Sequence, residues 1–326
     1  MSNLDVVGIG NAIVDVLSHT DDAFLKANDL VKGSMRLIDP EEAQNLYSRM
    51  GPATEISGGS AANTIAGIAA LGGQAAYIGK VADDQLGDIF AHDLQATGVL
   101  YRTDRLIGDL ATARSMILVT PDAERTMNTF LGASNKLTPS DVDEDLISRA
   151  QYTYLEGYLW DPEEAKDAFR HAMRMAHQHG RKVALTLSDS FCVDRFRDEF
   201  KQLVTEIDLL FANEDEICSL YEVDEFDDAL QAVRSAGTMA ALTRSEKGSL
   251  LMRGDEIHLI DAVPGVDVVD TTGAGDLYAA GVLAGLTQGR GLGEAGHMGA
   301  IAAAEVISHM GARPEADLRE MVAEAL

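Results

Sequence analysis

Short apolar runs alternate with helix-like segments along most of the chain. Strand-like runs occur at residues 4–10, 74–82, 152–160, 182–189 and 208–216. Longer segments with apolar residues at helical spacing lie between several of these runs. This βαβ order is typical of a parallel sheet that is covered by helices. The pattern therefore predicts an α/β fold around one mostly parallel central sheet.

Two segments interrupt this alternation. Residues 17–38 and 101–130 contain no long amphipathic helix, and the second segment has the pattern of a hairpin around Pro121 and Asp122. Structureless loops of this length are uncommon in compact domains, so we expect a small β-rich lid here, with loose surface loops as the alternative. The expected large domain comprises the rest of the chain, residues 1–16, 39–100 and 131–326.

The charge balance excludes several classes of partner. The chain of 326 residues has 26 Lys and Arg residues against 53 Asp and Glu residues, which gives a net charge of −27. Such a surface repels nucleic acid and anionic lipid, so we expect neither partner. It also repels free phosphate compounds. A phosphate ligand would therefore need a local source of positive charge at its site, such as backbone N–H groups, a metal ion or single basic residues.

The cysteine pattern and the hydropathy bear on the compartment. The two cysteines, Cys192 and Cys218, have no spacing that suggests a metal site or a disulfide framework. No segment approaches the run of about 18 apolar residues that crosses a membrane. We therefore expect reduced thiols and a cytoplasmic protein.

Two common nucleotide-binding signatures are absent. In GIGNAI, which starts at Gly8, Ile13 stands where the dinucleotide fingerprint requires its last glycine. In GQAAYIGKV, the spacing from Gly73 to Gly79 is one residue too long for a P-loop, and Val81 replaces the required Ser or Thr. Neither a Rossmann dehydrogenase nor a P-loop enzyme is therefore expected.

The segment DTTGAGDLYAAG at residues 270–281 places small residues and a carboxylate at the start of an apolar helix. Gly273, Ala274 and Gly275 would let a ligand approach the unpaired N–H groups of the first turn, which favour negative charge. Asp276 could be the helix N-cap or a catalytic group, and the local pattern favours both roles equally. Taken alone, the segment predicts an anion site.

Three motifs together resemble one enzyme family. DTTGAGDLYAAG resembles the C-terminal signature of the ribokinase-like carbohydrate and nucleoside kinase (PfkB) family, and SGGSAANT at 57–64 resembles its N-terminal signature. GNAIVDV at 10–16 is similar to the opening of the adenosine kinase branch. The resemblance implies a three-layer α/β/α domain with a lid. It also implies transfer of the γ-phosphoryl group of ATP to the 5′-hydroxyl of adenosine, in purine nucleoside salvage.

The resemblance implies roles for the residues that match the family motifs. Asp276 would be the base that activates the acceptor hydroxyl, and residues 273–275 would form an anion hole. The sugar would be held by Asn11, Asp15, Gly58, Gly59 and Asn63. Seen singly, Asp15 is an ordinary turn residue and Asn63 an ordinary polar residue of a helix.

Further matches concern ATP and its metal ion. Asn213 and Glu216 match the motif that orders Mg²⁺ and phosphate through water, although a helix N-cap is an equal local interpretation. Thr243 and Gly248 match the loop that contacts ATP, but Ser245 stands where the family usually has a glycine. The resemblance leaves room for a monovalent cation such as K⁺ as well.

Candidate residues for the base pocket follow from position alone. Tyr158 and Trp160 lie where adenosine kinases have a base-stacking segment, and Phe191 and Leu131 could close the pocket. Core packing is an equal interpretation for each of these four residues. Arg114, on the proposed lid hairpin, could reach the transferred phosphate, and a solvated surface position is the alternative.

Two other functions stay open. The first is a sugar kinase of the same family that acts on ribose or fructose, and the second is a nucleoside-binding regulator without catalysis. The expected partners are a nucleoside or a sugar, together with ATP. The expected assembly is a monomer or a homodimer.

Overall fold

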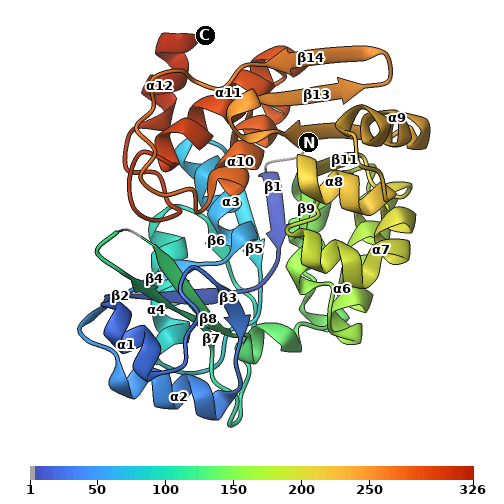
Figure 1. Ribbon diagram of the computed structural model, residues 1–326. Helices are drawn as coiled ribbons and strands as arrows, with labels where there is room; N and C mark the ends of the chain where they lie inside the picture. Colours follow the sequence, from blue (N-terminus) through green and yellow to red (C-terminus); the bar gives the residue numbers. More distant parts are fainter. Residues whose placement is uncertain (1–3, 123) are drawn as a thin grey trace.

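The computed structural model describes residues 4–122 and 124–326, which form two β-sheets with helices packed around them (Figure 1). Within these residues the larger sheet has nine strands in the order β14-β13-β12-β11-β10-β9-β1-β5-β6. Its strands are β1 (Leu4–Ile9), β5 (Ala75–Ile78), β6 (Leu100–Tyr101), β9 (Ala150–Glu156), β10 (Lys182–Thr186), β11 (Leu209–Asn213), β12 (Met239–Thr243), β13 (Ser249–Arg253) and β14 (Glu256–Ile260). All neighbours pair in parallel except β12 with β13 and β13 with β14.

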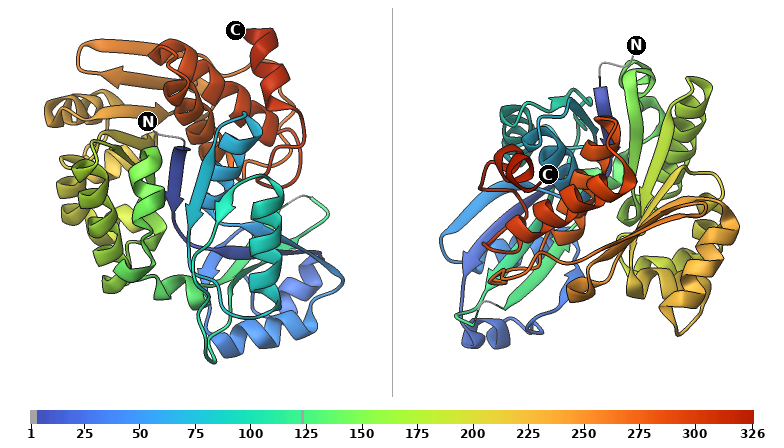
Figure 2. Two further views of the ribbon diagram at one scale, coloured as in Figure 1. Left: turned by 180° about the vertical axis from the view of Figure 1, so that it is seen from behind. Right: turned by 90° about the horizontal axis from the view of Figure 1, so that it is seen from above.

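Helices cover both faces of the larger sheet, as the two further views show (Figure 2). One face packs against α3 (Ser60–Ala70), α4 (Gln85–Ala96), α10 (Ala274–Thr287), α11 (Leu292–Val306) and α12 (Leu318–Ala325). The other packs against α5 (Glu144–Arg149), α6 (Glu163–Gln178), α7 (Ser190–Val204), α8 (Glu214–Tyr221) and α9 (Phe226–Ala236). On β1, Val6 joins the first core, while Val7 and Ile9 join the second, as alternating strand residues must. The α/β fold with a mostly parallel sheet is therefore confirmed.

Short 3₁₀ turns connect several of these elements. The turns are η1 (Gly132–Lys136), η2 (Pro139–Asp141), η3 (Gly157–Leu159) and η4 (Ser245–Lys247). In the described part of the chain, no helix is both long and apolar enough to span a membrane.

The smaller sheet has five strands within the described residues, in the order β3-β8-β7-β2-β4. Its elements are β2 (Ile13–His19), α1 (Asp22–Ala27), β3 (Met35–Leu37), α2 (Pro40–Arg49), β4 (Ala53–Gly58), β7 (Ala113–Val119) and β8 (Arg125–Phe130). β7 and β8 pair antiparallel and enclose Pro121 and Asp122, which confirms the expected hairpin.

The smaller sheet contains more of the chain than the residues expected for the lid. β4 lies within 39–100, which the sequence assigned to the large domain, yet it pairs antiparallel with β2 from Ile13↔Gly58 to Ser18↔Ala53. α2 packs against β7 and β8 of the same sheet. In the sequence, the amphipathic pattern of α2 is the same as that of a helix in a βαβ unit. Its place beside the smaller sheet depends on the pairing of β4 with β2, which are far apart in sequence.

The strand order places a natural ligand site at one edge of the larger sheet. β1 lies between β5 and β9, and the chain adds later strands on opposite sides of it. In open α/β sheets, ligands bind outside the carboxyl ends of the strands where the order reverses in this way. The smaller sheet begins directly after β1 at Ile13, so it lies beside this edge (Figure 1).

Candidate active site

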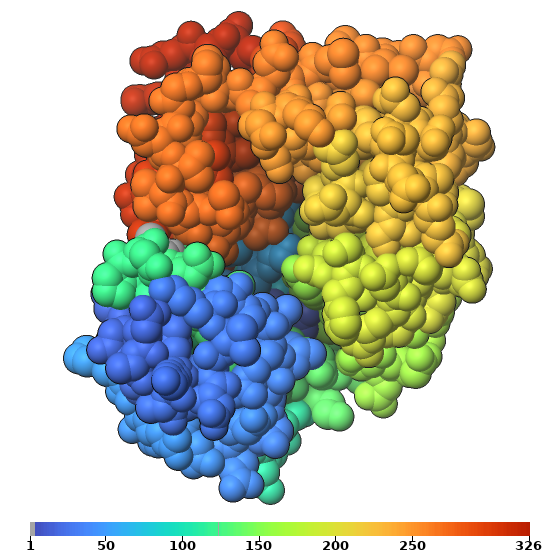
Figure 3. Space-filling model, viewed as in Figure 1, coloured from blue at the N-terminus to red at the C-terminus, as the bar shows by residue number. Residues whose placement is uncertain are grey.

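A cavity of about 880 Å³ lies where the smaller sheet, the carboxyl ends of the central strands and the start of α10 meet. The space-filling view shows a hollow between the blue, orange and yellow-green parts of the chain (Figure 3). Asp15 of the smaller sheet, Thr243 at the end of β12 and Asp276 of α10 all line it. Three parts of the chain that are far apart in sequence therefore face one space.

The start of α10 leaves backbone donors without a side-chain cap. Gly273 precedes the helix with φ of 80°, and no side chain caps this end. A Cβ at Gly273 would lie 2.7 Å from the Cβ of Ala312, so both the backbone angle and the space require glycine. Gly273, Ala274 and Gly275 all line the cavity. The arrangement can bind an anion through N–H groups and the helix dipole.

Asp276 does not cap its own helix. Its Oδ1 accepts a hydrogen bond from Ser60 Oγ at 2.6 Å, and its Oδ2 accepts one from Asn63 Nδ2 at 3.0 Å. Both partners lie on α3, so the carboxylate joins α3 to α10 at the cavity wall. Burial raises the pKa of Asp276 above its ordinary value, while the two hydrogen bonds oppose the rise. A carboxylate with a raised pKa is suited to act as a general base.

The glycine pair at 58 and 59 makes room for the polar groups beside it. A Cβ at Gly58 would lie 2.3 Å from Asp15 Oδ2, and a Cβ at Gly59 would lie 2.3 Å from the carbonyl oxygen of Asn11. Gly59 also has φ of 94°, which favours glycine. Asp15, Gly59 and Asn63 line the cavity. Within the described residues, the buried Asn63 Oδ1 has no hydrogen-bond partner, so it can accept one from a ligand hydroxyl.

Asn11 and Gly58 are close to the cavity but do not line it. Asn11 is buried, and its Nδ2 and backbone N–H donate to Glu156 Oε1 at 2.8 and 3.2 Å. The Oε2 atom of Glu156 accepts from the N–H of Ala61 at 2.7 Å. Glu156, which the sequence analysis missed, therefore ties the end of β1 to the start of α3, where Asp276 finds its partners. Burial raises the pKa of Glu156 to about 7.

Asn213 and Glu216 line the cavity at the start of α8 and bond to each other. Asn213 Nδ2 donates to Glu216 Oε1 at 2.7 Å, the N–H of Asn213 donates to Oε2 at 3.0 Å, and the N–H of Glu216 donates to Asn213 Oδ1 at 2.8 Å. Residues 4–122 and 124–326 contain no cluster of three His, Cys, Asp or Glu side chains that could hold a metal ion. Mg²⁺ usually keeps several waters and binds phosphate oxygens, so one buried carboxylate and one amide fit contact through water.

Thr243, Ser245 and Gly248 line the cavity beside the end of β12. Ser245 has φ of 50°, in the region that favours glycine. Ser245 therefore has the backbone conformation that a glycine readily adopts, although a serine stands where the family usually has a glycine. A Cβ at Gly248, with φ of 80°, would lie 2.0 Å from the carbonyl oxygen of Ile260, so this glycine is required.

Comparison with known proteins gives a match to a family model over residues 29–318, described as pfkB family carbohydrate kinase. The chain belongs to the pfkB family. The crystal structure of adenosine kinase from Sinorhizobium meliloti is 54% identical, with a TM-score of 0.93 and coverage of 100% of both chains. A probable sugar kinase from Rhizobium etli is 52% identical, with a TM-score of 0.93 and coverage of 100% of this chain and 99% of that one. The adenosine kinase of Saccharomyces cerevisiae is 26% identical over 94% of this chain and 95% of its own.

Of the four expected base-pocket residues in this pfkB-family chain, only Tyr158 lines the cavity. The expectation for Trp160 is wrong: its side chain is 1% exposed, contacts the rings of Phe169 and Phe200, and donates from Nε1 to Glu199 Oε2 at 3.1 Å. The turn η3 carries it into the core behind the sheet. Phe191 is 62% exposed on the first turn of α7, and Leu131 is partly buried and does not line the cavity. Neither forms part of the pocket wall.

Arg114 does not face the cavity. It lies over the ring of Tyr47, with its guanidinium carbon 5.6 Å from the ring centre. A different arginine of the smaller sheet, Arg125, contacts the segment that precedes α10. Its Nη2 lies 2.5 Å from Asp270 Oδ2, and both side chains are more than nine-tenths buried. The sequence offered no reason to choose between two arginines on one hairpin, because their orientation depends on how the lid packs.

Arg313 is a second cation that the sequence analysis missed. Its Nη2 donates to the carbonyl oxygen of Ser57 at 3.2 Å, while its buried Nε and Nη1 have no partner in the described residues. Its charge lowers the pKa of Asp15 and of Asp276 against the effect of burial. The positive charge of Arg313 therefore partly offsets the cost of burying the carboxylates of Asp15 and Asp276.

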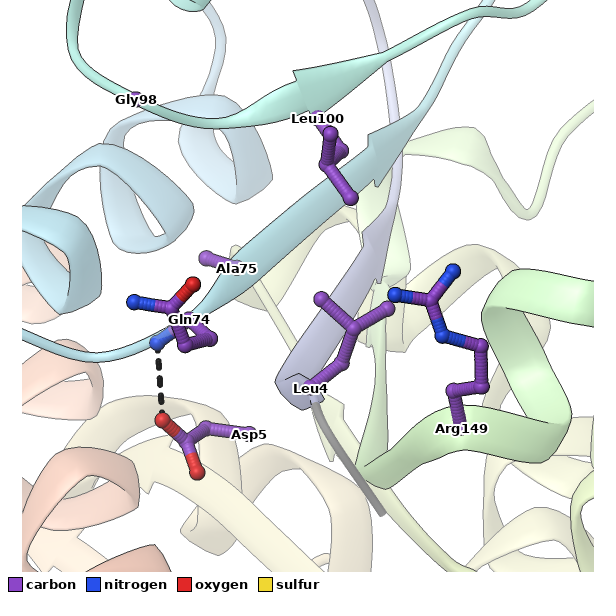
Figure 4. A pocket seen from close by; sticks show the side chains of 7 residues that line it. All are labelled: Leu4, Asp5, Gln74, Ala75, Gly98, Leu100 and Arg149. Atoms are coloured by element: carbon purple, nitrogen blue, oxygen red, sulfur yellow. Dashed lines mark hydrogen bonds between the residues drawn. The ribbon is translucent and has the colours of Figure 1, made fainter.

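A second hollow, of about 620 Å³, lies at the opposite edge of the larger sheet (Figure 4). Leu4, Asp5 and Gln74 surround it with Leu100 and Arg149, and Asp5 Oδ2 accepts from the N–H of Gln74 at 2.8 Å. This hollow lies at the amino ends of β1 and β5. Ligands of α/β folds bind at the carboxyl ends, so the cavity beside Asp276 is the candidate active site.

Proposed function

We propose that this pfkB-family kinase transfers the γ-phosphoryl group of ATP to the 5′-hydroxyl of adenosine, forming AMP and ADP. One observation carries the proposal. Asp276 is held by Ser60 and Asn63 beside the uncapped start of α10, in a cavity that also contains Asp15 and the aromatic Tyr158. Residues suited to act as a base, to bind an anion, to hold a sugar and to stack on a base therefore line one cavity. The likeness to the Sinorhizobium meliloti adenosine kinase over the whole chain supports the same substrate.

Each group of this chain has a defined task in the proposed reaction. Asp276 accepts the proton of the 5′-hydroxyl as its oxygen attacks the γ-phosphorus, and the bond to the bridging oxygen of ADP breaks. The N–H groups of residues 273–275 stabilise the charge on the transferred group. When bound, Mg²⁺ neutralises charge on the ATP phosphates, and Asn213 and Glu216 would hold its water ligands. Asp15 and Asn63 orient the ribose.

A sugar kinase is the second candidate. The probable sugar kinase from Rhizobium etli is 52% identical over the whole chain, and Asp15 with Asn63 would suit the hydroxyls of any sugar. Tyr158 favours a nucleoside, because an aromatic face gives a purine a large contact area. A regulator without catalysis is a weaker candidate, since binding alone requires neither Asp276 nor the Asn213–Glu216 pair.

The acceptor panel tests the proposal directly. We expect adenosine to give the highest kcat/KM among adenosine, guanosine, inosine, ribose and fructose, by roughly 10-fold to 200-fold, which is the discrimination that a pocket contact provides. The measurement is ADP release at saturating ATP and Mg²⁺, with the Asp276→Asn variant as the control for contaminating kinases. Highest activity with ribose or fructose would favour the sugar kinase. No turnover with any acceptor would favour the regulator.

The acceptor should bind better as the pH rises through about 7. Burial raises the pKa of Asp15 to about 7, although Arg313 and Arg125 oppose the rise. Below this pH Asp15 is mostly protonated and loses the charge that strengthens its hydrogen bonds to the acceptor hydroxyls. We therefore expect kcat/KM for the acceptor to fall by up to about tenfold per pH unit. The measurement is kcat/KM for the acceptor between pH 5.5 and 9.

The Asp15→Asn variant separates this titration from others. Its acceptor kcat/KM should be low, and the part of the acid limb that is specific to the acceptor should be lost. The pH profile of kcat/KM for ATP in the native enzyme serves as the comparison. It shows how much of the loss of activity at low pH comes from titration of the nucleotide and of Asp276. An unchanged acid limb in Asp15→Asn contradicts the assignment.

A further inference from the structure

Four non-glycine residues within the described ranges have a left-handed backbone: Asp29, Ser188, Glu222 and Ser245. Glu222 is the C-cap of α8, and Asp29 follows the C-cap of α1, where this conformation is common. Ser188 and Ser245 are different, because neither ends an α-helix and both line the cavity. Ser245 belongs to the nucleotide loop. Ser188 lies beside Tyr158 and has no role in the reaction described above.

Ser188 is the central residue of a tight turn at the end of β10. The N–H of Asp189 donates to the carbonyl oxygen of Leu187 at 2.9 Å, and Ser188 between them has φ of 71°. A three-residue turn with this bond and a positive φ is the rarer, strained form of the γ-turn. Strained backbone persists where the surrounding structure holds it, and it occurs often at binding sites.

The turn packs against the end of β9, from which Tyr158 enters the cavity. A Cβ at Gly157 would lie 2.6 Å from the carbonyl oxygen of Leu187, so the two strand ends are in direct contact. Ser188 Oγ accepts a hydrogen bond from the N–H of Tyr158 at 3.3 Å, and the N–H of Ser188 donates to Thr186 Oγ1 at 3.3 Å. Strain, packing and hydrogen bonds thus fix the Ser188 hydroxyl beside the aromatic residue.

The Ser188 hydroxyl still has its own proton to donate. A hydroxyl offers one proton and two lone pairs, and the contact with Tyr158 uses a lone pair. Within residues 4–122 and 124–326, no acceptor receives the proton of Ser188 Oγ, and Ser188 lines the cavity. A donor in this position can meet a hydrogen-bond acceptor of a bound molecule.

We propose that Ser188 is a specificity residue for the nucleoside, whose hydroxyl positions Tyr158 and donates a hydrogen bond to the bound base. The proposal rests on the proposed nucleoside kinase function. Purine rings carry nitrogen lone pairs that accept such a bond, and free ribose or fructose has no base in this place. The strained turn is kept because a relaxed turn would direct the hydroxyl elsewhere.

Two variants separate the hydroxyl from the backbone strain. Ser188→Ala removes the hydroxyl and keeps the strain, while Ser188→Gly removes both. We expect both variants to raise KM for adenosine about tenfold, the effect of one lost hydrogen bond, and to leave KM for ATP within about twofold. We expect Ser188→Gly alone to raise Tm, because glycine adopts a positive φ without strain.

Glu222→Gly is the matched control, since Glu222 has φ of 56° and lies at the end of α8 rather than in the cavity. It should leave both KM values unchanged, while its Tm reflects the relieved strain together with the lost ion pairs of Glu222 with Lys201 and Arg197. An unchanged adenosine KM in Ser188→Ala, or an equal rise in both KM values, overturns the inference. A native enzyme that is inactive on nucleosides contradicts the proposed function itself. An active native enzyme whose adenosine KM does not respond to Ser188→Ala contradicts the inference alone.

Discussion

The Asp276→Asn variant should lose roughly 10² to 10⁴ in kcat, the usual contribution of a general base, and should keep its fold. Asparagine has nearly the same shape but cannot accept the proton of the acceptor hydroxyl. It also has one acceptor oxygen in place of two, so Ser60 Oγ and Asn63 Nδ2, which now bond to separate oxygens, must rearrange. KM for ATP should change little. The measurement is steady-state kcat with each substrate at saturation, together with Tm.

The Ser60→Ala variant is the control for the geometry of the base. It removes one hydrogen bond at 2.6 Å and leaves the carboxylate of Asp276 in place. The loss in kcat should therefore be about tenfold or less, as expected for one hydrogen bond. Near-normal turnover in Asp276→Asn excludes Asp276 as the base. A loss in Ser60→Ala as large as that in Asp276→Asn would mean that position, rather than proton transfer, limits the rate.

The sequence predicted the groups whose physical requirement restricts the residue type at single positions of a short motif. Gly273 needs a positive φ next to Ala312, and Gly58 and Gly59 need space beside Asp15 and Asn11. Requirements of this kind restrict the residue type at one position, so they are visible in a short motif. The family model over residues 29–318 and the sheet order bear out the fold and the family that these motifs indicated.

Groups whose place depends on long-range packing could not be predicted in this way. Trp160 and Tyr158 are two residues apart, yet the turn η3 directs one into the core and the other into the cavity. Arg125 was missed because its partner, Asp270, is far away in sequence and comes close only when the smaller sheet packs on the body. Glu156 was missed for the same reason, since it connects β1 to α3.

The Gly273→Ala variant should lose roughly 10² to 10³ in kcat, the effect of removing one donor from an anion hole. Alanine at φ of 80° is strained by about 1–2 kcal/mol, and its Cβ would lie 2.7 Å from the Cβ of Ala312. The backbone must therefore rotate or shift, which redirects the N–H groups at the start of α10. The measurement is kcat at saturating ATP and adenosine, with Tm to follow the strain.

Gly237→Ala separates the cost of the backbone angle from the loss of the anion site. Gly237 also has φ of 80°, but it ends α9 and a Cβ there would have nothing within 4 Å. The control should lower Tm through strain alone and keep normal turnover. If both variants lower Tm equally and both keep normal turnover, the start of α10 does not stabilise the transferred phosphoryl group. A loss of turnover confined to Gly273→Ala supports an anion hole that depends on the conformation of one glycine.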